Sequence, residues 1–375
     1  MRKILLTCAA LFAMAWMCGT TWYVNPGAGG ANNGTSQGDA WESADSADFY
    51  WGAGDSILFL GGETTSTAIA WSNAVGQGAA KNPLWLIGVN SSWVDDGTKY
   101  LISGGASATN CLTYTQLDYT VLKNFEFTDA TGDGLLLIVG ASRSSYNYFW
   151  NLYAHDNGGA GIDHGGSGNR ANIFDQISSI NNTGEGIDGW ADGEYAPIMY
   201  DSEIAGCGSH PINGPIGPIT RTVFYDNTTA IAPFGNPNFW AFDGCVFDGG
   251  SFSDRGGSGL LHLRNCKLTN GPADNFDATF SHVWAINNYY DTASIYDRVV
   301  DLGGSTTAGE ANYADTANNN YGATDSSALR RFERNIGANG TSLYYGTAGL
   351  PPADTAGGGG GGGAFFFPYI MRHGN

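Results

Sequence analysis

A short pattern of apolar and turn-forming residues recurs along the middle of the chain. An apolar residue lies two positions before each turn residue, and a second core-facing position lies three after it. Residues two apart in a strand point the same way, so each run predicts short strands on both sides of a bend. The turn residues, spaced about 23 residues apart on average, are Asn124, Asn151, Asp175, Asp201, Arg221, Gly244, Asn265 and Asn287. The inward residues before them are Leu122, Phe149, Ile173, Met199, Ile219, Phe242, Leu263 and Ala285.

A second aliphatic landmark follows later in several of these repeats. It is seen at Gly134-Leu135, Gly161-Ile162, Gly186-Ile187, Pro211-Ile212 and Ala230-Ile231. Short strands that repeat at this period predict a solenoid with one coil per repeat. The Leu-x-x-Leu-x-Leu signature of leucine-rich repeats is absent, and a propeller blade needs about 40 residues. The pattern therefore favours a parallel β-helix.

Several segments carry a resemblance to a known family. They are Thr21-Trp22-Tyr23-Val24-Asn25-Pro26, Asn33-Gly34-Thr35-Ser36, Gly54-Asp55-Ser56-Ile57-Leu58-Phe59, Lys81-Asn82-Pro83-Leu84-Trp85-Leu86-Ile87-Gly88 and Ile102-Ser103-Gly104. Over roughly residues 21 to 325, the chain resembles the pectin-lyase-like superfamily. The resemblance implies an all-β fold, a right-handed parallel β-helix of about eight or more coils of ~23 residues. It does not select an activity, because the superfamily includes lyases, hydrolases, epimerases and non-catalytic adhesins.

The two ends differ from the repeat region. A basic start, Met1-Arg2-Lys3, precedes the apolar run from Ile4 to Cys18, which is typical of a secretory signal and shorter than a membrane span of about 20 residues. We therefore expect a signal peptide at 1–19, a β-helix domain at 20–345 and no transmembrane span in the mature chain. Seven consecutive glycines, Gly357 to Gly363, make 346–375 a flexible linker with a short aromatic tail. The tail is either a disordered end or a segment that docks on a partner.

Composition narrows the class of protein. The 375 residues include 57 glycines, 16 Lys and Arg, and 35 Asp and Glu, which gives a formal net charge of −19. A nucleic-acid partner is not expected, because little in the chain can neutralise phosphates. Glycine also disfavours a helical bundle. The composition instead indicates a turn-rich β protein that is secreted, periplasmic or at the cell surface.

Aspartates follow the aliphatic landmark in consecutive repeats. Asp163, Asp188 and Asn213 should stack on three neighbouring coils about 4.8 Å apart. Close carboxyl groups raise one another's pKa, which supplies an acid beside a base. The same three side chains are also candidates for calcium, which binds clustered oxygen ligands. The plainer alternative is that Gly-Ile-Asp is turn chemistry of the fold.

Further candidate residues lie in the loops that follow these aspartates. His164 and Arg170 follow the first aspartate, and Trp190, Asp192 and Glu194 follow the second. With Asp163 and Asp188 as the acidic pair, we expect His164, Arg170, Asp192 and Glu194 to support catalysis, and Trp190 to contact substrate.

Aromatic residues occupy the position just before the turn in three consecutive repeats. Trp150, Phe174 and Tyr200 should form an outward stripe, and exposed apolar patches usually mark interaction sites. Aromatic faces suit the C–H faces of sugar rings. The alternative is that another segment of the chain covers the stripe.

Two functions from different classes fit these features. The first is a secreted β-helix protein that binds a polysaccharide or surface glycan and, if it is an enzyme, cleaves it as a glycoside hydrolase or polysaccharide lyase. The second is a non-catalytic surface protein, such as an adhesin or a phage-type fibre or receptor-binding protein, which the glycine linker and aromatic tail favour. No cofactor is certain from the sequence, and calcium at Asp163, Asp188 and Asn213 is the one candidate.

Overall fold

The computed structural model of the 375-residue chain describes its β-helical part in separate stretches. These are residues 19–49, 52–72, 78–115, 117–138, 144–165, 171–189, 197–214, 217–227, 230–231, 239–252, 260–269, 282–286, 288–290, 299–301, 306–307, 313–315 and 320–323. Most of the predicted signal peptide and the whole of the predicted tail lie outside these residues. No helix in the described stretches is long and apolar enough to cross a membrane.

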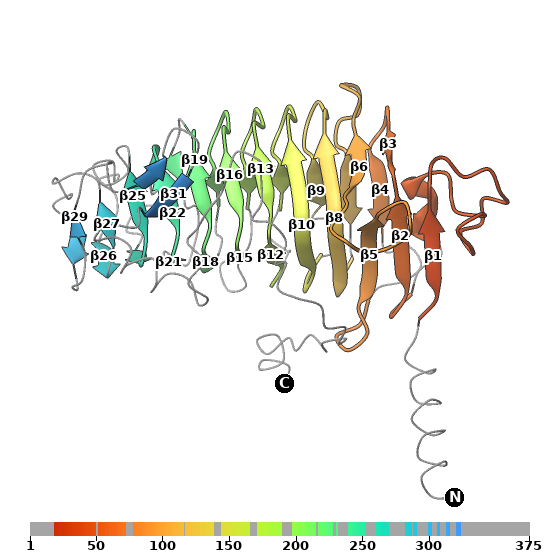
Figure 1. Cartoon of the computed structure of the whole chain (residues 1–375), viewed down its shortest axis with the longest axis horizontal. Helices are drawn as coiled ribbons and strands as arrows, with labels where there is room; N and C mark the ends of the chain where they lie inside the picture. The colour runs from red at the N-terminus through yellow and green to blue at the C-terminus, as the bar shows by residue number, and fades with distance from the viewer. Residues whose placement is uncertain are drawn as a thin grey trace, which may run out of the picture.

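The chain winds into successive coils whose strands pair in parallel and form three faces, which we call the first, second and third arm (Figure 1). The strands of the first arm are β1 (Thr21–Val24), β2 (Ser56–Leu60), β5 (Leu84–Val89), β12 (Ile173–Asp175), β15 (Ile198–Tyr200), β18 (Ile219–Thr220), β21 (Phe239–Asp243), β24 (Leu260–Arg264), β26 (His282–Ile286) and β28 (Val299–Asp301). Two longer strands, β8 (Thr120–Thr128) and β10 (Tyr148–His155), run through both the first and the second arm.

The second arm continues the same sheet, and the third arm forms a sheet of its own. The remaining strands of the second arm are β3 (Gly62–Thr64), β6 (Tyr100–Ser103), β13 (Ser178–Ile180), β16 (Glu203–Ala205), β19 (Val223–Tyr225), β22 (Val246–Asp248), β25 (Lys267–Thr269), β27 (Tyr289–Tyr290) and β29 (Thr306–Thr307). The third arm contains β4 (Ile69–Ser72), β7 (Leu112–Thr115), β9 (Leu135–Ile138), β11 (Ile162–Asp163), β14 (Ile187–Asp188) and β17 (Ile212–Asn213), and β20 (Ala230–Ile231) pairs separately with β23 (Ser251–Phe252). A short 3₁₀ helix, η1 (Ala44–Phe49), and an antiparallel pair, β30 (Tyr313–Asp315) and β31 (Asn320–Ala323), complete the described elements.

A single residue in the left-handed conformation makes the bend between the first and second arms. Asn124 and Asn151 have φ of 59° and 53°, and asparagine tolerates this region better than most residues. The Asn151 amide donates to the Asn124 amide oxygen at 2.7 Å, so the bend residues also bond along the helix axis. These bends confirm the predicted turn column at both positions.

The predicted column is wrong by one residue in the next coil. Gln176, not Asp175, has the left-handed φ of 55°. Phe149 pairs in register with Phe174, and Phe174 pairs with Met199, so Phe174 is the inward residue in place of Ile173. The reason is packing: the Phe174 ring is buried and stacks on Phe149 with centroids 5.1 Å apart. Stacking of this large ring in the core outweighs the better turn propensity of aspartate. A further predicted turn residue, Asn287, lies outside the described residues.

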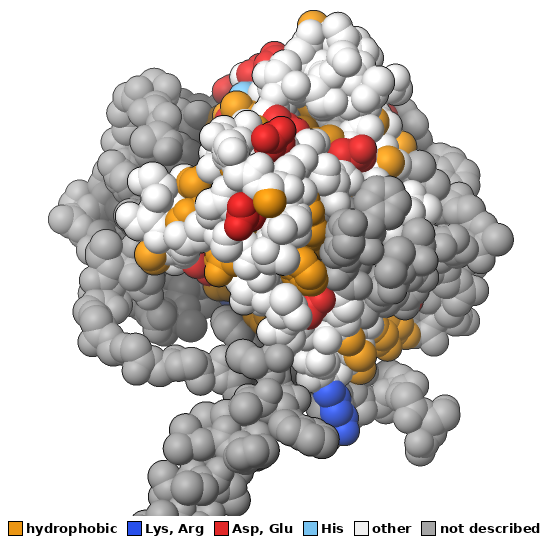
Figure 2. Space-filling view, turned by 90° about the vertical axis from the view of Figure 1, so that its right-hand side faces the viewer, with side chains coloured by type: hydrophobic (Ala, Val, Ile, Leu, Met, Phe, Trp, Pro, Cys, Tyr) orange, Lys and Arg blue, Asp and Glu red, His pale blue; other side chains and the backbone are white. Residues whose placement is uncertain are grey.

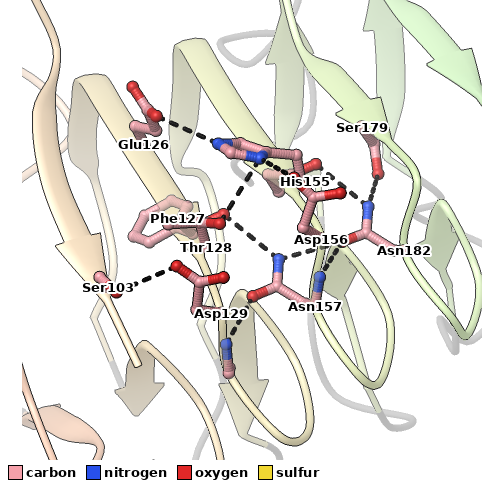
Figure 3. A network of polar contacts seen from close by, with 12 residues as sticks. Ser103, Glu126, Phe127, Thr128, Asp129, His155, Asp156, Asn157, Ser179 and Asn182 are labelled. Atoms are coloured by element: carbon pink, nitrogen blue, oxygen red, sulfur yellow. Dashed lines mark hydrogen bonds and ion pairs between the residues drawn. The ribbon is translucent and has the colours of Figure 1, made fainter. Parts of the chain in front are cut away.

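Buried asparagines bond successive coils together at the bend between the second and third arms (Figure 3). The Asn157 amide donates to Asn182 Oδ1 at 3.0 Å and to the Phe127 carbonyl at 3.2 Å. Asn182 in turn donates to the Ala154 carbonyl at 3.0 Å. These bonds satisfy backbone groups that the bend leaves without a partner in the sheets, so the asparagines hold the corner at a fixed angle.

Apolar side chains of all three arms fill the inside of the helix. Phe59, Phe125, Phe149 and Trp71 are fully buried, and Cys245 and Cys266 lie buried and unbridged in adjacent coils. Figure 2 looks along the helix onto the end at which β1 lies, where acidic side chains are scattered over the surface. Because apolar side chains fill the interior, a ligand can contact only the outward side chains of the arms.

Candidate functional site

Three polar side chains form a row along the outer face of the third arm, which we call the acidic row. Asp163 of β11 pairs in register with Asp188 of β14, and Asp188 pairs with Asn213 of β17. The preceding isoleucines, Ile162, Ile187 and Ile212, are fully buried. Because side chains alternate along a strand, the next residue of each strand points outward. The structure thus brings these three residues together as the sequence predicted.

Two more carboxyl groups flank the acidic row at the bend that leads into the third arm. Asp133 and Glu185 each stand just before the glycine of the aliphatic landmark, two coils apart. Asp133 accepts from the Ala160 amide at 2.8 Å, and Glu185 accepts from Ser209 at 3.0 Å. Neither residue belongs to the predicted site, which consists of residues that follow the landmark, whereas Asp133 and Glu185 directly precede its glycine.

Local backbone geometry crowds the carboxyl group of Asp163. A Cβ placed on Gly165 would lie 2.7 Å from Asp163 Oδ1, so a larger residue there would require the carboxyl group of Asp163 to move. That oxygen atom is buried without a hydrogen-bond partner among the described residues, whereas a hydrogen bond from the Gly165 backbone N–H to the carboxyl group lowers its pKa. A buried carboxyl oxygen without a donor favours the protonated form of the group.

Burial and mutual repulsion raise the pKa values of the acidic row. The pKa of Asp163 rises to about 7, chiefly because burial disfavours the charged form, and then because of the charges of Asp133 and Asp188. The pKa of Asp188 rises to about 6, through burial and the charge of Glu185, against a hydrogen bond from Asn213 that lowers it. Burial also raises the pKa of Asp133. At neutral pH the row therefore contains both protonated and ionised carboxyl groups, as acid–base catalysis requires.

The structure places His164 inside the helix, which contradicts its predicted role at the site. The ring is fully buried, and Asn172 Nδ2 lies 2.8 Å from its Nε2. It contacts Phe174 edge-on, with ring centroids 5.7 Å apart. The physical reason is strand alternation: Ile162 points in, Asp163 points out, and His164 points in again. Burial lowers the pKa of His164 to about 3, so it is a neutral core residue.

The candidate calcium ligands are arranged less favourably than their spacing suggests. Asn213 Nδ2 donates to Asp188 Oδ1 at 3.1 Å, so the amide directs its nitrogen toward the carboxylate. Calcium takes oxygen ligands from carboxylates and amides. In the described part of the chain, no three Asp, Glu, His or Cys side chains lie where they could hold a metal ion. Calcium binding by Asp163, Asp188 and Asn213 stays a prediction.

The predicted aromatic stripe is only partly formed and lies on another face. Trp150 and Tyr200 are half-buried on the outer side of the first arm, whereas Asp163 and Asp188 belong to the third. Phe174 does not contribute, because the one-residue register shift turns it into the core and puts Asp175 between Trp150 and Tyr200. The other predicted site residues, Arg170, Trp190, Asp192 and Glu194, lie outside the described residues.

Comparisons with known proteins support the architecture. No protein-family model matches the chain, and no curated protein matches its sequence. Among solved structures it is similar to the crystal structure of pectate lyase Pel9A, with a TM-score of 0.54, 15% identity, and coverage of 92% of this chain and 94% of that one. It is also similar to a rhamnogalacturonan lyase, with a TM-score of 0.55, 12% identity, and coverage of 89% and 97%. Together with the parallel coils and the bends between their arms, these likenesses show that the chain has the right-handed parallel β-helix fold.

Proposed function

We propose that this protein binds a polysaccharide and hydrolyses its glycosidic bonds at the acidic row. The observation that carries the proposal is the pair of outward carboxyl groups on adjacent coils, Asp163 and Asp188, with pKa values of about 7 and 6. Perturbed carboxyl groups of this kind are commonly catalytic. The two similar structures are named as a pectate lyase and a rhamnogalacturonan lyase, which supports a polysaccharide ligand for this chain.

The pair suits the two roles of a retaining glycosidase. Asp163, which has the higher pKa, is the general acid and gives its proton to the glycosidic oxygen as that bond breaks. The Asp188 carboxylate attacks the anomeric carbon and forms a glycosyl ester. Water then displaces Asp188 and gives a proton back to Asp163. Register partners lie about 4.8 Å apart, close to the separation of about 5–5.5 Å between the carboxyl groups of retaining enzymes.

Charge favours hydrolysis over elimination. A lyase removes a proton beside a carboxylate of an acidic sugar, and that carboxylate needs positive charge or a metal ion near it. The described carboxyl groups in and beside the acidic row are those of Asp163, Asp188, Asp133 and Glu185. They outnumber the basic side chain of His210, which stands at the same bend as Glu185, one coil along. A net charge of −19 also repels polyanions. The geometry thus fits a neutral glycan better than an acidic one.

The test is turnover on a glycan panel by the purified chain and by two carboxamide variants. The panel contains neutral glycans, such as glucans, xylans and mannans, together with pectate and alginate. We expect reducing ends to form from a neutral glycan, and Asp163→Asn and Asp188→Asn each to lose about 10²-fold or more of the rate. Asp129→Asn is the matched control, because it makes the same change at an exposed bend residue of a neighbouring coil.

Each result separates the alternatives. Full activity in both carboxamide variants would show that the chemistry occurs elsewhere. Unsaturated sugar ends in the products would show elimination in place of hydrolysis. Glycan binding without turnover on any member of the panel would support the non-catalytic surface or fibre protein. We also propose that the protein acts outside the cytoplasm, because its basic start and the apolar run that follows are typical of a secretory signal.

A further inference from the structure

Outward aromatic side chains gather on the first arm. Trp85, Tyr148, Trp150 and Tyr200 are half-buried there, and Trp284 of β26 is 43% exposed. On the outer face of the third arm, the described residues of β9, β11, β14 and β17 are aliphatic, acidic or amide. The first arm therefore presents a surface of a different chemical kind from the acidic row.

The outer residues of the first arm form one continuous row along the helix axis. Register pairing joins Lys123 to Trp150, Trp150 to Asp175, Asp175 to Tyr200, and Tyr200 to Thr220. We call these five residues the first-arm row. Adjacent members lie about 4.8 Å apart, so their side chains recur at the pitch of the coils.

The charges around the first-arm row are paired with one another. Lys123 Nζ lies 2.6 Å from Asp95 and 3.9 Å from the centroid of the Trp150 ring. Arg221 bonds both oxygens of Asp201, at 2.5 and 2.6 Å. Farther along the same face, Arg264 pairs with Asp243. With each of these cations matched by a carboxylate, the surface has little net attraction for a charged ligand.

Asp175 supplies a hydrogen-bonding group between the two aromatic side chains. Its Oδ2 accepts from the Tyr148 hydroxyl, and its Oδ1 is a buried atom without a hydrogen-bond partner among the described residues. Burial raises the pKa of Asp175, against the hydrogen bond from Tyr148, which lowers it. A carboxyl group flanked by rings can bond a hydroxyl group of a ligand that stacks on them.

We propose that the first-arm row is a second glycan-binding surface, separate from the acidic row, which holds a neutral polysaccharide strand along the helix axis by stacking on Trp150 and Tyr200. A polysaccharide is favoured because its chemical units repeat, as the row does, and because hydroxyl groups match the carboxyl and hydroxyl groups between the rings. The paired charges favour a neutral strand. The surface goes beyond the proposed hydrolysis, since it stands whether or not the acidic row is catalytic.

The experiment measures binding in a chain that does not turn over its ligand. Asp163→Asn/Asp188→Asn serves as the host, and the probes are hexasaccharides of β-linked glucose, xylose and mannose, with hexagalacturonate as the acidic comparison. Calorimetry gives the dissociation constant for each. We expect a neutral hexasaccharide to bind, and Trp150→Ala or Tyr200→Ala to weaken it about tenfold or more, because central aromatic anchors dominate such contacts. Trp150→Phe should retain most of the affinity.

Tyr153→Ala is the matched control, because Tyr153 lies on the same strand, β10, but on the second arm. It should leave the dissociation constant within about twofold of the host value, since it lies outside the row. Circular dichroism and the melting temperature check that every variant is folded. The proposal is overturned if no neutral hexasaccharide binds, if hexagalacturonate binds more tightly, or if Trp150→Ala and Tyr200→Ala bind as the host does. Failure of the hydrolysis proposal gives a different result: the unmodified chain would bind a neutral hexasaccharide but would not cleave it.

Discussion

Two clusters of charged residues in the same coil show opposite electrostatics. On the second arm, His155 lies between two carboxylates, with Nε2 at 3.1 Å from Glu126 and Nδ1 at 2.7 Å from Asp156 (Figure 3). Eight residues later, on the third arm, Asp163 faces Asp188 and Asp133. Burial lowers the pKa of His155, but the hydrogen bonds to Glu126 and Asp156 outweigh it, so that pKa is raised. Each cluster therefore holds its protons more tightly than free side chains do, for different reasons.

The difference indicates which cluster stabilises the fold and which one costs stability. The His155 cluster gains attraction between opposite charges, and its ring stacks on Tyr153 with centroids 4.1 Å apart. The acidic row gains nothing from ionisation, because like charges and burial both oppose it. A cluster that opposes its own charge is the better candidate for chemistry, since strain of this kind is generally retained where function needs it.

The largest expected effect concerns the pH dependence of turnover. The active form needs Asp163 protonated and Asp188 ionised, so the rate should peak between their pKa values, about 6 to 7, and fall on both sides. Asp163→Asn should lower the rate at the optimum by about 10²–10⁴-fold and remove the alkaline limb. The measurement is kcat against pH on the best glycan of the panel. An unchanged alkaline limb in this variant would assign the acid to another group.

Stability should change in the opposite direction in the same variant. The folded pKa of Asp163 is raised from 3.8 to about 7, so the folded chain binds the proton more tightly and loses stability as pH rises through that window. Asparagine does not titrate and escapes this loss. At pH 8 we expect Asp163→Asn to increase the free energy of unfolding by roughly 1–3 kcal/mol, with little change at pH 4. Urea titration at both pH values measures it, and a loss of stability at pH 8 would contradict the electrostatic account.

The fold and the alignment of the acidic row could be predicted from the sequence, because a solenoid converts sequence spacing into spatial columns. Asp163 is predicted to lie beside Asp188 as soon as Ile162 and Ile187 are assigned to equivalent inward positions in adjacent coils. The sequence pattern predicts Ile173 as the inward residue in place of Phe174, because Asp175 has better turn propensity than Gln176. No local rule shows that stacking on a ring of the neighbouring coil decides the register. The pKa values also depend on burial and on partners such as Asp133, which pattern alone does not supply.

A smaller effect is expected at the His155 cluster, with the reverse pH dependence. Because the folded pKa of His155 is raised, its contribution is complete below the unfolded value of 6.5 and is lost as pH rises through the folded pKa. His155→Ala should cost about 0.5–1 kcal/mol at pH 5.5, a value limited by solvent screening of this surface pair. Above the folded pKa, only the packing on Tyr153 is lost. Urea titration of this variant and of Tyr153→Ala, at pH 5.5 and at a pH above the folded pKa of His155, separates the contribution of charge from that of ring stacking.

The smallest expected effect is the change in melting temperature on adding calcium, which would supply positive charge to the acidic row. Calcium binds ionised carboxylates, so binding at Asp163, Asp188 and Asn213 requires a pH above the raised pKa values of about 7 and 6. The calcium hypothesis therefore predicts that millimolar calcium raises the melting temperature by a few degrees at pH 8, has no effect at pH 5, and has none at either pH in Asp188→Asn. Chelation should reverse the gain. Magnesium is the control ion, because it releases its waters reluctantly and needs near-octahedral geometry. An equal rise in melting temperature at pH 5, or in Asp188→Asn, would show that calcium binds elsewhere on this acidic protein. No rise at pH 8 would contradict calcium binding at the acidic row.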